Sequence, residues 1–375
     1  MRKVYLDNAA TTPLRPEVIV EMALSLERDF GNPSSTHMFG RQAKSAVELA
    51  RKSIAKNLNC TAQEIIFTSG ATEATNWIFR NAIKALGVTR IITSRIEHHA
   101  VLHTVSAMEQ EYGTTVDYVK IKATGEIDLS HLTELLSVEG KTLVSLMHVN
   151  NEIGTVLDLE LTGRICKQHG ALFHSDTVQS IGKASFDLQK IPIDFIVASA
   201  HKFHGPKGVG FLFIRKGVLM NPLIFGGEQE KGLRAGTEAV HNIAGMAKAL
   251  DIAYEHWDHE RDYIMNLRNY TASELRRYFP DVKINGNEQT GFYNLLNACL
   301  PFSEDKTSMI LFHLDMKGIA VSRGSACQSG SAKPSHVLAE VLQADDLKKP
   351  SLRISFSHFN TTEDIDLLIE ALRTL

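Results

Sequence analysis

Length, composition and charge limit the classes of protein that this sequence can encode. The chain has 375 residues and a mass of 41.6 kDa, which is long for a single core and favours one large domain with a smaller one. Its 43% hydrophobic and 22% charged residues are typical of a globular protein. A net charge of -3 and a pI near 6.6 give no basic surplus, so we expect no direct contact with nucleic acid or an anionic membrane.

Targeting signals and cysteine spacing exclude further classes. No apolar run approaches the ~20 residues of a membrane-spanning helix, and the first residues, MRKVYLDNAATTP, turn polar before a signal segment could form. We therefore expect a cytoplasmic protein. Cys60, Cys166, Cys299 and Cys327 are widely separated, without a CxxC pair or a histidine at zinc-ligand spacing. Neither a disulfide framework nor a metal site is expected, so the thiols remain for burial or chemistry.

The first two thirds of the chain alternate short apolar runs with amphipathic stretches. The runs predict strands at 64–69, 90–94, 116–121, 142–147, 171–176, 194–199 and 210–215. Apolar residues at helical spacing predict helices at 99–112, 129–138 and 161–169. Such alternation indicates an α/β domain around a mostly parallel or mixed sheet, in which ligands bind beyond the carboxyl ends of the strands.

The remainder of the chain has a different pattern. A charged helical stretch at 258–279 precedes short strands at 282–285, 293–300, 319–322 and 352–357 and a closing helix. This pattern predicts a smaller α+β domain. We place the large domain at residues 16–254 and the small one at 1–15 and 255–375. Because there are no repeats or long proline-rich linkers, we expect the two domains to pack together.

A lysine stands directly after one predicted strand. Ser199, His201 and Lys202 follow the run DFIVA and precede the glycine-rich GPKGVG. In an apolar pocket at that position, desolvation would lower the pKa of the Lys202 amine and make it available for a Schiff base. The alternative is a surface lysine on a turn, with Ser199 and His201 as ordinary polar turn residues.

An acidic residue ends another predicted strand. Asp176 closes the run ALFHSD and is followed by TVQ. A carboxylate there could pair with a protonated pyridine nitrogen and keep the ring an electron sink. The alternative is a helix N-cap, a position that aspartate also favours.

The segment TSGATEATN joins a predicted strand to a helix. Gly70, Ala71 and Thr72 could present backbone N–H groups and a hydroxyl to a phosphate at that helix N-terminus. A plain capping turn is the alternative for this segment.

Histidines and asparagines follow two further strands. His98 could stack on a flat ring and exchange protons near neutral pH, whereas His99 is more typical of a structural residue. In the segment 148–152, HVNNE, the asparagines could instead fix a loop.

Cys327 lies in the segment SRGSACQSG, which is small and polar and has no hydrophobic period. Such a segment predicts an exposed loop, suited to a thiolate that meets both a buried substrate and an external acceptor. An unreactive loop thiol is the alternative. Cys60, Cys166 and Cys299 have apolar or helical neighbours and are expected to be buried.

Taken together, these motifs resemble the cysteine desulfurases of the iron-sulfur-assembly type, within the class V aminotransferase group. The resemblance covers nearly the whole chain and is carried by YLDNAATTPLRPEV, GNPSSTHMFGR, TSGATEATN, EHHAVL, HVNNEIGT, DTVQSIGK, SAHKFHGPKGVGF, GTEAV, GSACQSG and LRISFSHFNTTEDID. SAHK with the GPKG turn and GSAC are specific in combination, whereas YLDNAATT is shared by many relatives. The implied fold is the aspartate aminotransferase-like, fold type I pyridoxal-phosphate transferase fold, with a mainly parallel seven-stranded sheet in the large domain.

The resemblance implies roles for individual residues and a coenzyme, pyridoxal 5'-phosphate. Lys202 would be the Schiff-base lysine, Cys327 the persulfide carrier and His98 a ring-stacking proton carrier. The coenzyme would further contact Ala71, Thr72, Asn151, Asp176, Val178, Gln179, Ser199 and His201, and Thr237 of a neighbouring subunit. Arg353 would clamp the carboxylate of L-cysteine, assisted by Asn151. A homodimer is implied, together with a sulfur-acceptor protein such as an iron-sulfur scaffold or a tRNA-thiolation enzyme.

Three positions depart from the family pattern, and other functions share part of it. Ala235 stands where serine is frequent, Val178 where alanine or threonine is frequent, and Ser357 where glycine is frequent. The last departure bears on the backbone beside Arg353. An aminotransferase or a selenocysteine lyase would keep the same lysine, aspartate and arginine, and a sulfur carrier without catalysis is a non-enzymatic alternative.

Overall fold

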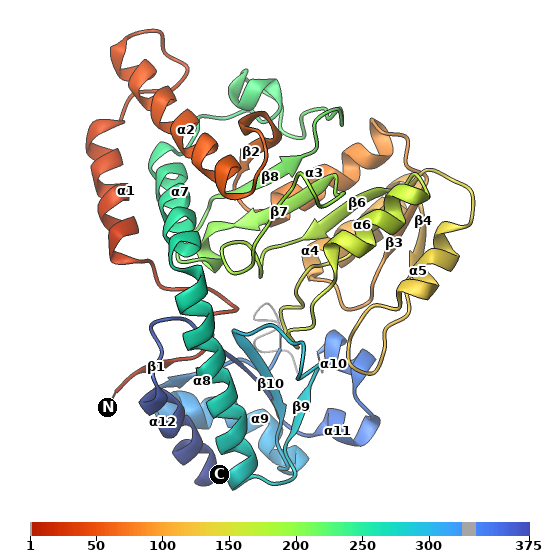
Figure 1. Ribbon diagram of the computed structural model, residues 1–375, viewed down its shortest axis with the longest axis vertical. Helices are drawn as coiled ribbons and strands as arrows, with labels where there is room; N and C mark the ends of the chain where they lie inside the picture. The colour runs from red at the N-terminus through yellow and green to blue at the C-terminus, as the bar shows by residue number, and fades with distance from the viewer. Residues whose placement is uncertain (1, 325–334) are drawn as a thin grey trace.

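A computed structural model describes residues 2–324 and 335–375. Its upper part in Figure 1 is a seven-stranded sheet in the order β2-β8-β7-β6-β5-β3-β4. The strands are β2 (Ile65–Thr68), β3 (Arg90–Thr93), β4 (Thr115–Tyr118), β5 (Thr142–Ser145), β6 (Leu172–Asp176), β7 (Phe195–Ser199) and β8 (Gly210–Ile214). In this sheet β8 runs antiparallel to both neighbours and the other pairs are parallel. The predicted mainly parallel sheet is confirmed.

Helices cover both faces of this sheet, which is why β2, β3, β5, β7 and β8 are buried at every position. Ile91 packs into one core and Ile92 into the other, as expected for side chains that alternate between faces. One face is covered by α3 (Ala71–Lys84) and α4 (His99–Tyr112). The other core includes residues of α1 (Pro16–Arg28), α2 (Met38–Asn57), α5 (Leu129–Leu136), α6 (Leu159–Gln168) and α7 (Val240–Glu255).

The lower part in Figure 1 has its own core around a three-stranded antiparallel sheet, β12-β10-β9. These strands are β9 (Lys283–Asn285), β10 (Leu295–Cys299) and β12 (Ser351–Ser355). The helices are α8 (Trp257–Tyr278), α9 (Glu304–Met316), α10 (His336–Val341), α11 (Ala344–Lys348) and α12 (Thr362–Arg373). The amino-terminal strand β1 (Val4–Tyr5) pairs here with β11 (Ile319–Ala320). The domain boundaries at 16–254 and at 1–15 with 255–375 stay a prediction, because clusters of packed side chains do not mark where a domain begins.

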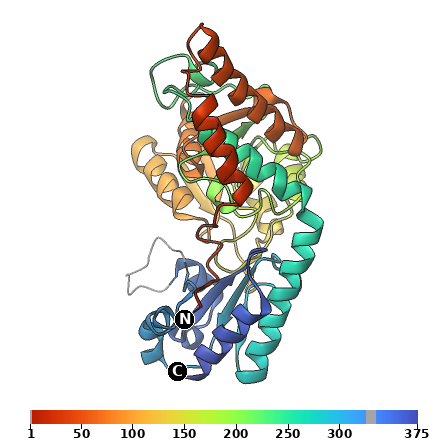
Figure 2. The same cartoon turned by 90° about the vertical axis from the view of Figure 1, so that its left-hand side faces the viewer.

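The two parts are joined by the long helix α8, which runs down the side of the molecule in Figure 2. Between them passes the amino-terminal segment, on its way from β1 to α1. The predicted helix 99–112 is found with these bounds, and those at 129–138, 161–169 and 258–279 are found with ends shifted by one or two residues. Helices α1, α2, α7, α9, α10 and α11 were not predicted. Among the described residues, no helix has both the length and the apolar character required to cross a membrane.

Candidate active site

A cavity of about 250 Å³ opens at the carboxyl ends of the parallel strands, where the sequence predicts ligand binding. Ten of the predicted site residues line it: Ala71, Thr72, His98, Asn151, Asp176, Val178, Gln179, Ser199, His201 and Lys202. Arg353 lines it from β12 of the lower part. Thr237 is exposed and is absent from the lining, and Cys327 lies outside the described residues.

Lys202 ends a short turn, η2 (Ala200–Lys202), that directly follows β7. Its Nζ donates hydrogen bonds to the carbonyl oxygens of Ala9 (2.6 Å) and Ala10 (2.9 Å). The Gln179 side-chain amide donates to the Ala9 carbonyl as well, at 2.9 Å. The amino-terminal segment therefore forms one wall of the cavity and holds the amine within it.

The same amino-terminal segment also makes hydrogen bonds to the turn that contains Lys202. The Thr12 N–H and hydroxyl both donate to the His201 carbonyl at 2.9 Å, and the His204 N–H donates to the Thr12 hydroxyl at 2.7 Å. His204 has a positive φ of 65°, a conformation that is costly for a residue with a side chain. These contacts hold the backbone beside Lys202 in one conformation.

Asp176 closes β6 and is buried at the floor of the cavity. Its Oδ1 accepts a hydrogen bond from the Val178 N–H at 3.0 Å. Burial raises the pKa of the Asp176 carboxyl, while the nearby His98 and Lys202 act in the opposite direction. A cation placed against this carboxylate, such as a protonated pyridine nitrogen, would compensate the burial.

His98 is the N-cap of α4, and its Nδ1 accepts the Ala100 N–H at 3.1 Å. Burial lowers the pKa of His98, which favours the neutral ring. With Nδ1 accepting, the proton of the neutral ring is on Nε2. Behind it, the buried Glu97 accepts the Ser94 hydroxyl at 2.7 Å and the Met147 N–H at 3.1 Å, and burial raises its pKa to about 8. Glu97 is thus a neutral support for the cavity wall near pH 7.

The turn before α3 forms the end of the cavity predicted to take a phosphate. Gly70 has a φ of 153°, and the Ala71 N–H donates to the Ser199 hydroxyl at 2.9 Å. A side chain on Gly210 of β8 would meet the Ala198 carbonyl at 2.1 Å, so only glycine lets β8 pass this close to the turn. His201 stands with its Nδ1 3.2 Å from the Thr11 hydroxyl, and burial lowers its pKa to about 4.

Arg353 enters the cavity from the middle of β12 and is 1% exposed. Its Nη1 donates to the Asn151 carbonyl at 2.9 Å, and its Nη2 donates to Asp7 Oδ1 at 2.8 Å. Its Nε has no hydrogen-bond partner among residues 2–324 and 335–375. Because Nη1 and Nη2 each carry a second N–H, a guanidinium that lines the cavity is suited to receiving the carboxylate of a small substrate.

The remaining sequence predictions separate into structural and chemical residues. Asn150 fixes its loop by accepting the N–H groups of Glu152 and Ile153, whereas Asn151 reaches the cavity. Cys166 and Cys299 are buried as predicted, but Cys60 is only partly buried. Burial raises the pKa of Cys60 and of Cys166 to about 12 and also raises that of Cys299, so none of the three is a ready thiolate.

The departure at Ser357 carries no backbone strain. Ser357 is not among the described residues with a positive φ, so a glycine is not required there. Its N–H donates to Asn360 Oδ1 at 2.9 Å, which closes a local turn after β12. The backbone beside Arg353 therefore tolerates the serine. The contacts of Asp7, Ala9 and Ala10, all within the motif YLDNAATT, were not predicted from the sequence.

Comparison with known proteins decides the family. The model of the class-V aminotransferases matches residues 4–368. The chain belongs to the class-V aminotransferase family. A curated relative, the cysteine desulfurase IscS of Dictyoglomus turgidum, is 41% identical over 376 residues, covering 100% of this chain and 94% of the relative. The family predicted from the motifs is confirmed.

Solved structures agree with this assignment. A NifS-like protein has a TM-score of 0.91 at 37% identity and covers 100% of this chain and 99% of its own. A protein described as SspA in complex with cysteine has a TM-score of 0.82 at 30% identity and covers 96% of this chain and 100% of its own. The predicted fold class is confirmed, and pyridoxal 5'-phosphate is the coenzyme of this family.

The residues present fit this coenzyme. A lysine amine and a buried carboxylate line the same cavity as a turn at a helix N-terminus, and these suit its aldehyde, ring nitrogen and phosphate respectively. Arg353 lines the same cavity, where its guanidinium can receive a substrate carboxylate.

Proposed function

We propose that this chain is a pyridoxal-phosphate-dependent cysteine desulfurase, which converts L-cysteine to L-alanine and passes the sulfur to an acceptor protein through a persulfide on Cys327. The observation that carries the proposal is that Lys202, Asp176 and Arg353 line one cavity. Asp176 ends β6, Lys202 lies in the turn after β7, and Arg353 lies in the middle of β12, far away in the sequence. The names of the relatives supply the substrate, since they are called cysteine desulfurases.

Most of the cavity residues serve to hold the coenzyme. When bound, the coenzyme supplies an electron sink that makes the Cα proton of the amino acid removable. The phosphate would be held by Ala71, Thr72, Ser199 and His201, and the ring by His98, Asn151, Asp176, Val178 and Gln179. Asp176 would favour a protonated ring nitrogen, because a buried carboxylate is stabilised by a positive charge beside it.

Lys202 has two tasks. Its amine would hold the coenzyme aldehyde covalently, and as a free amine it would take the Cα proton of the substrate. The Ala9 and Ala10 carbonyls, which accept from Nζ, are positioned to orient this amine between the two tasks. His98, neutral and protonated on Nε2, can exchange a proton with the substrate thiol.

Arg353 and Asn151 select the amino acid. Asp7 and the Asn151 carbonyl each accept one N–H of the guanidinium, and Nη1 and Nη2 each carry a second N–H for the substrate carboxylate. Since its orientation is fixed by these two contacts, Arg353 binds the carboxylate without first losing side-chain freedom.

Cys327 takes the sulfur. Its thiolate attacks the sulfur of the bound cysteine, so that an S–S bond forms while the substrate C–S bond breaks, and the substrate Cβ gains a proton. One L-cysteine and one Cys327 thiol give one L-alanine and one Cys327 persulfide. The acceptor would be an iron-sulfur scaffold or a tRNA-thiolation enzyme. The functional form would be a cytoplasmic homodimer in which Thr237 reaches the coenzyme phosphate of the neighbouring subunit.

The decisive experiment uses Cys327→Ala beside the parent protein. Both are incubated with L-cysteine, with and without dithiothreitol, and alanine, sulfide and intact mass are measured. The parent should form alanine and sulfide with dithiothreitol, and without it should gain one sulfur atom at Cys327. Cys327→Ala should keep the visible absorbance of the lysine-bound coenzyme and lose sulfide release. Parental rates of desulfurisation in Cys327→Ala would refute the persulfide carrier.

A further inference from the structure

The segment that carries Thr237 is held in a costly backbone conformation. Within η3 (Gln229–Gly232), Glu230 has a φ of 48° and Lys231 a φ of 61°, although neither is glycine. Consecutive residues in this region persist only where the surrounding structure holds them. Two ion pairs supply that hold, and both lead to the turn predicted to bind phosphate.

The first ion pair anchors the start of the segment. The Glu230 carboxylate accepts from Arg51 Nη1 and Nη2, each at 2.7 Å, and from the Phe67 N–H at 2.8 Å. The Arg51 and Glu230 side chains are 3% and 2% exposed. Phe67 is in β2, the strand that runs into the Gly70 turn. Glu230 therefore ties the segment to the strand before that turn.

The second ion pair reaches the turn itself. Arg234 donates to Glu73 through Nε (2.9 Å) and Nη2 (3.2 Å), and the Ser69 N–H donates to the same carboxylate at 2.8 Å. Glu73 is in the first turn of α3, next to Thr72. One carboxylate thus holds the strand-to-helix turn on one side and Arg234 on the other, and these contacts lower the pKa of Glu73 despite its partial burial.

Thr237 follows Arg234 by three residues and is turned to solvent. The Gly236 N–H donates to Gln229 Oε1 at 3.1 Å, which closes the segment on itself. Thr237 does not line the cavity of its own chain. The segment 229–237 is therefore fixed to the turn predicted to bind phosphate in its own chain, while Thr237 remains exposed to solvent.

We propose that Arg234, held by Glu73, is a positioning residue that fixes Thr237 for the coenzyme phosphate in a second copy of this chain. This inference rests on the proposed function. Within each subunit, the turn that binds the subunit's own coenzyme phosphate would then be joined rigidly to Thr237, which contacts the phosphate bound by the other subunit. Arg234 itself touches neither coenzyme nor substrate.

A double-mutant cycle tests this role with coenzyme affinity as the readout. Apoprotein is titrated with pyridoxal 5'-phosphate and, separately, with pyridoxal, which lacks the phosphate, and dissociation constants are taken from the visible absorbance. Arg234→Gln and Thr237→Val should each weaken the phosphorylated form by about tenfold, the scale of one hydrogen bond to a charged group. The double variant should be no weaker than Thr237→Val alone, and pyridoxal should bind all variants as it binds the parent.

The chain offers a matched control in Arg80, which pairs with Glu111 through two contacts of 2.9 and 3.0 Å on the outer surface. Arg80→Gln should leave both affinities unchanged. Additive effects of Arg234→Gln and Thr237→Val would overturn the proposal, because Arg234 would then act on the phosphate turn of its own chain. Equal losses for pyridoxal, or unchanged affinity in Arg234→Gln, would also overturn it. If the parent bound no coenzyme, the proposed function itself would fail.

Discussion

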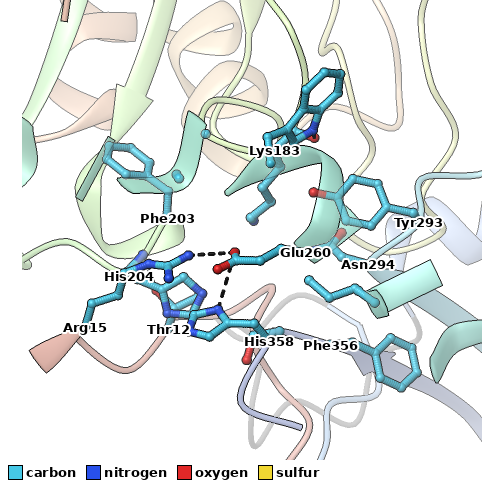
Figure 3. Close-up of a pocket in the computed structure, with 15 residues that line it drawn as sticks. Thr12, Arg15, Lys183, Phe203, His204, Glu260, Tyr293, Asn294, Phe356 and His358 are labelled. Atoms are coloured by element: carbon cyan, nitrogen blue, oxygen red, sulfur yellow. Dashed lines mark hydrogen bonds and ion pairs between the residues drawn. The ribbon is translucent and has the colours of Figure 1, made fainter. Parts of the chain in front are cut away.

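Two cavities lie on either side of the turn that carries Lys202, and they differ in ways that distinguish a reactive site from a packed interior. The first, of about 250 Å³, opens to the carboxyl ends of the strands. The second, of about 20 Å³, is lined by residues of both cores and is shown in Figure 3. It has room for about one water molecule. Both are rich in charged side chains, so polar lining alone does not indicate a ligand site.

The difference lies in whether the carboxylate of each cavity has an ion-pair partner. In the second cavity Arg15 and Glu260 pair at 2.6 Å (Figure 3). His358 stands 3.6 Å from Glu260, but burial lowers its pKa to about 4, so it is neutral near pH 7 and adds little to the pair. In the first cavity, the buried Asp176 carboxylate accepts the Val178 N–H and forms no ion pair with a described residue. A buried carboxylate without an ion pair, together with adequate volume, distinguishes the first cavity.

The largest effect is expected from Lys202→Ala in the first cavity. Under the proposed function this amine links the coenzyme and moves the Cα proton, so turnover should fall to background, a loss of at least ~1000-fold. The visible absorbance of the linked coenzyme should vanish, as measured by spectrophotometry. Folding should be intact by circular dichroism, and a variant that still turned over cysteine would show that another amine does the work.

Arg353→Lys is expected to act on substrate binding. Lysine keeps the charge but cannot donate to Asp7, Asn151 and a carboxylate at the same time, so the KM for cysteine should rise by roughly 30-fold, the scale of a charged hydrogen bond, with kcat changed less. Initial rates over a range of cysteine concentrations measure this. An unchanged KM would remove Arg353 from the carboxylate site.

The residues of the first cavity also show which parts of the site could be predicted from the sequence. Lys202, Asp176 and His98 follow buried strands, and because the carboxyl ends of parallel strands meet at one edge, local motifs were sufficient to bring them together. The Ala9 and Ala10 carbonyls contact Lys202 across 193 and 192 residues through backbone atoms, which leave no mark on side-chain patterns. Asp7 reaches Arg353 across 346 residues. Such contacts depend on how the two cores pack and were not predictable.

Glu260→Ala in the second cavity should affect stability and spare chemistry. It leaves the buried Arg15 guanidinium without its counter-charge, and the free energy of unfolding should fall by about 3 kcal/mol. Urea denaturation of the holoenzyme measures the loss. The kcat per folded molecule should stay within about twofold, since a shift of this pair touches no cavity residue of the first site. A large fall in kcat without a loss of stability would erase the distinction between the cavities.

Lys183→Met is expected to have the smallest and a pH-dependent effect. The Lys183 Nζ is buried in the second cavity and has no hydrogen-bond partner among the described residues, and burial lowers its pKa to about 7. Between pH 7 and about 10.5 the unfolded chain holds a proton that the native chain has lost, so this lysine makes native stability rise with pH there. Below pH 7 the amine is protonated in the native chain as well, so the full free-energy cost of burying its charge is present.

Methionine removes that penalty. The variant should exceed the parent in unfolding free energy on the order of 1 kcal/mol at pH 6.5, and the gain should shrink toward pH 9.5. Urea denaturation at both pH values measures the two differences. A gain that grew with pH would mean that Lys183 is stabilised in its charged form.

The path of residues 4–12 has a practical consequence for handling the protein. These residues form a strand that pairs with β11, accept two hydrogen bonds from the Lys202 amine, and make hydrogen bonds to His201 and His204 through Thr12. Proteolytic removal of this segment, or a bulky fusion at its amino-terminal end, would disturb the proposed coenzyme pocket, although the segment lies far from Lys202 in the sequence. Affinity handles are therefore better attached after Leu375 than ahead of Val4.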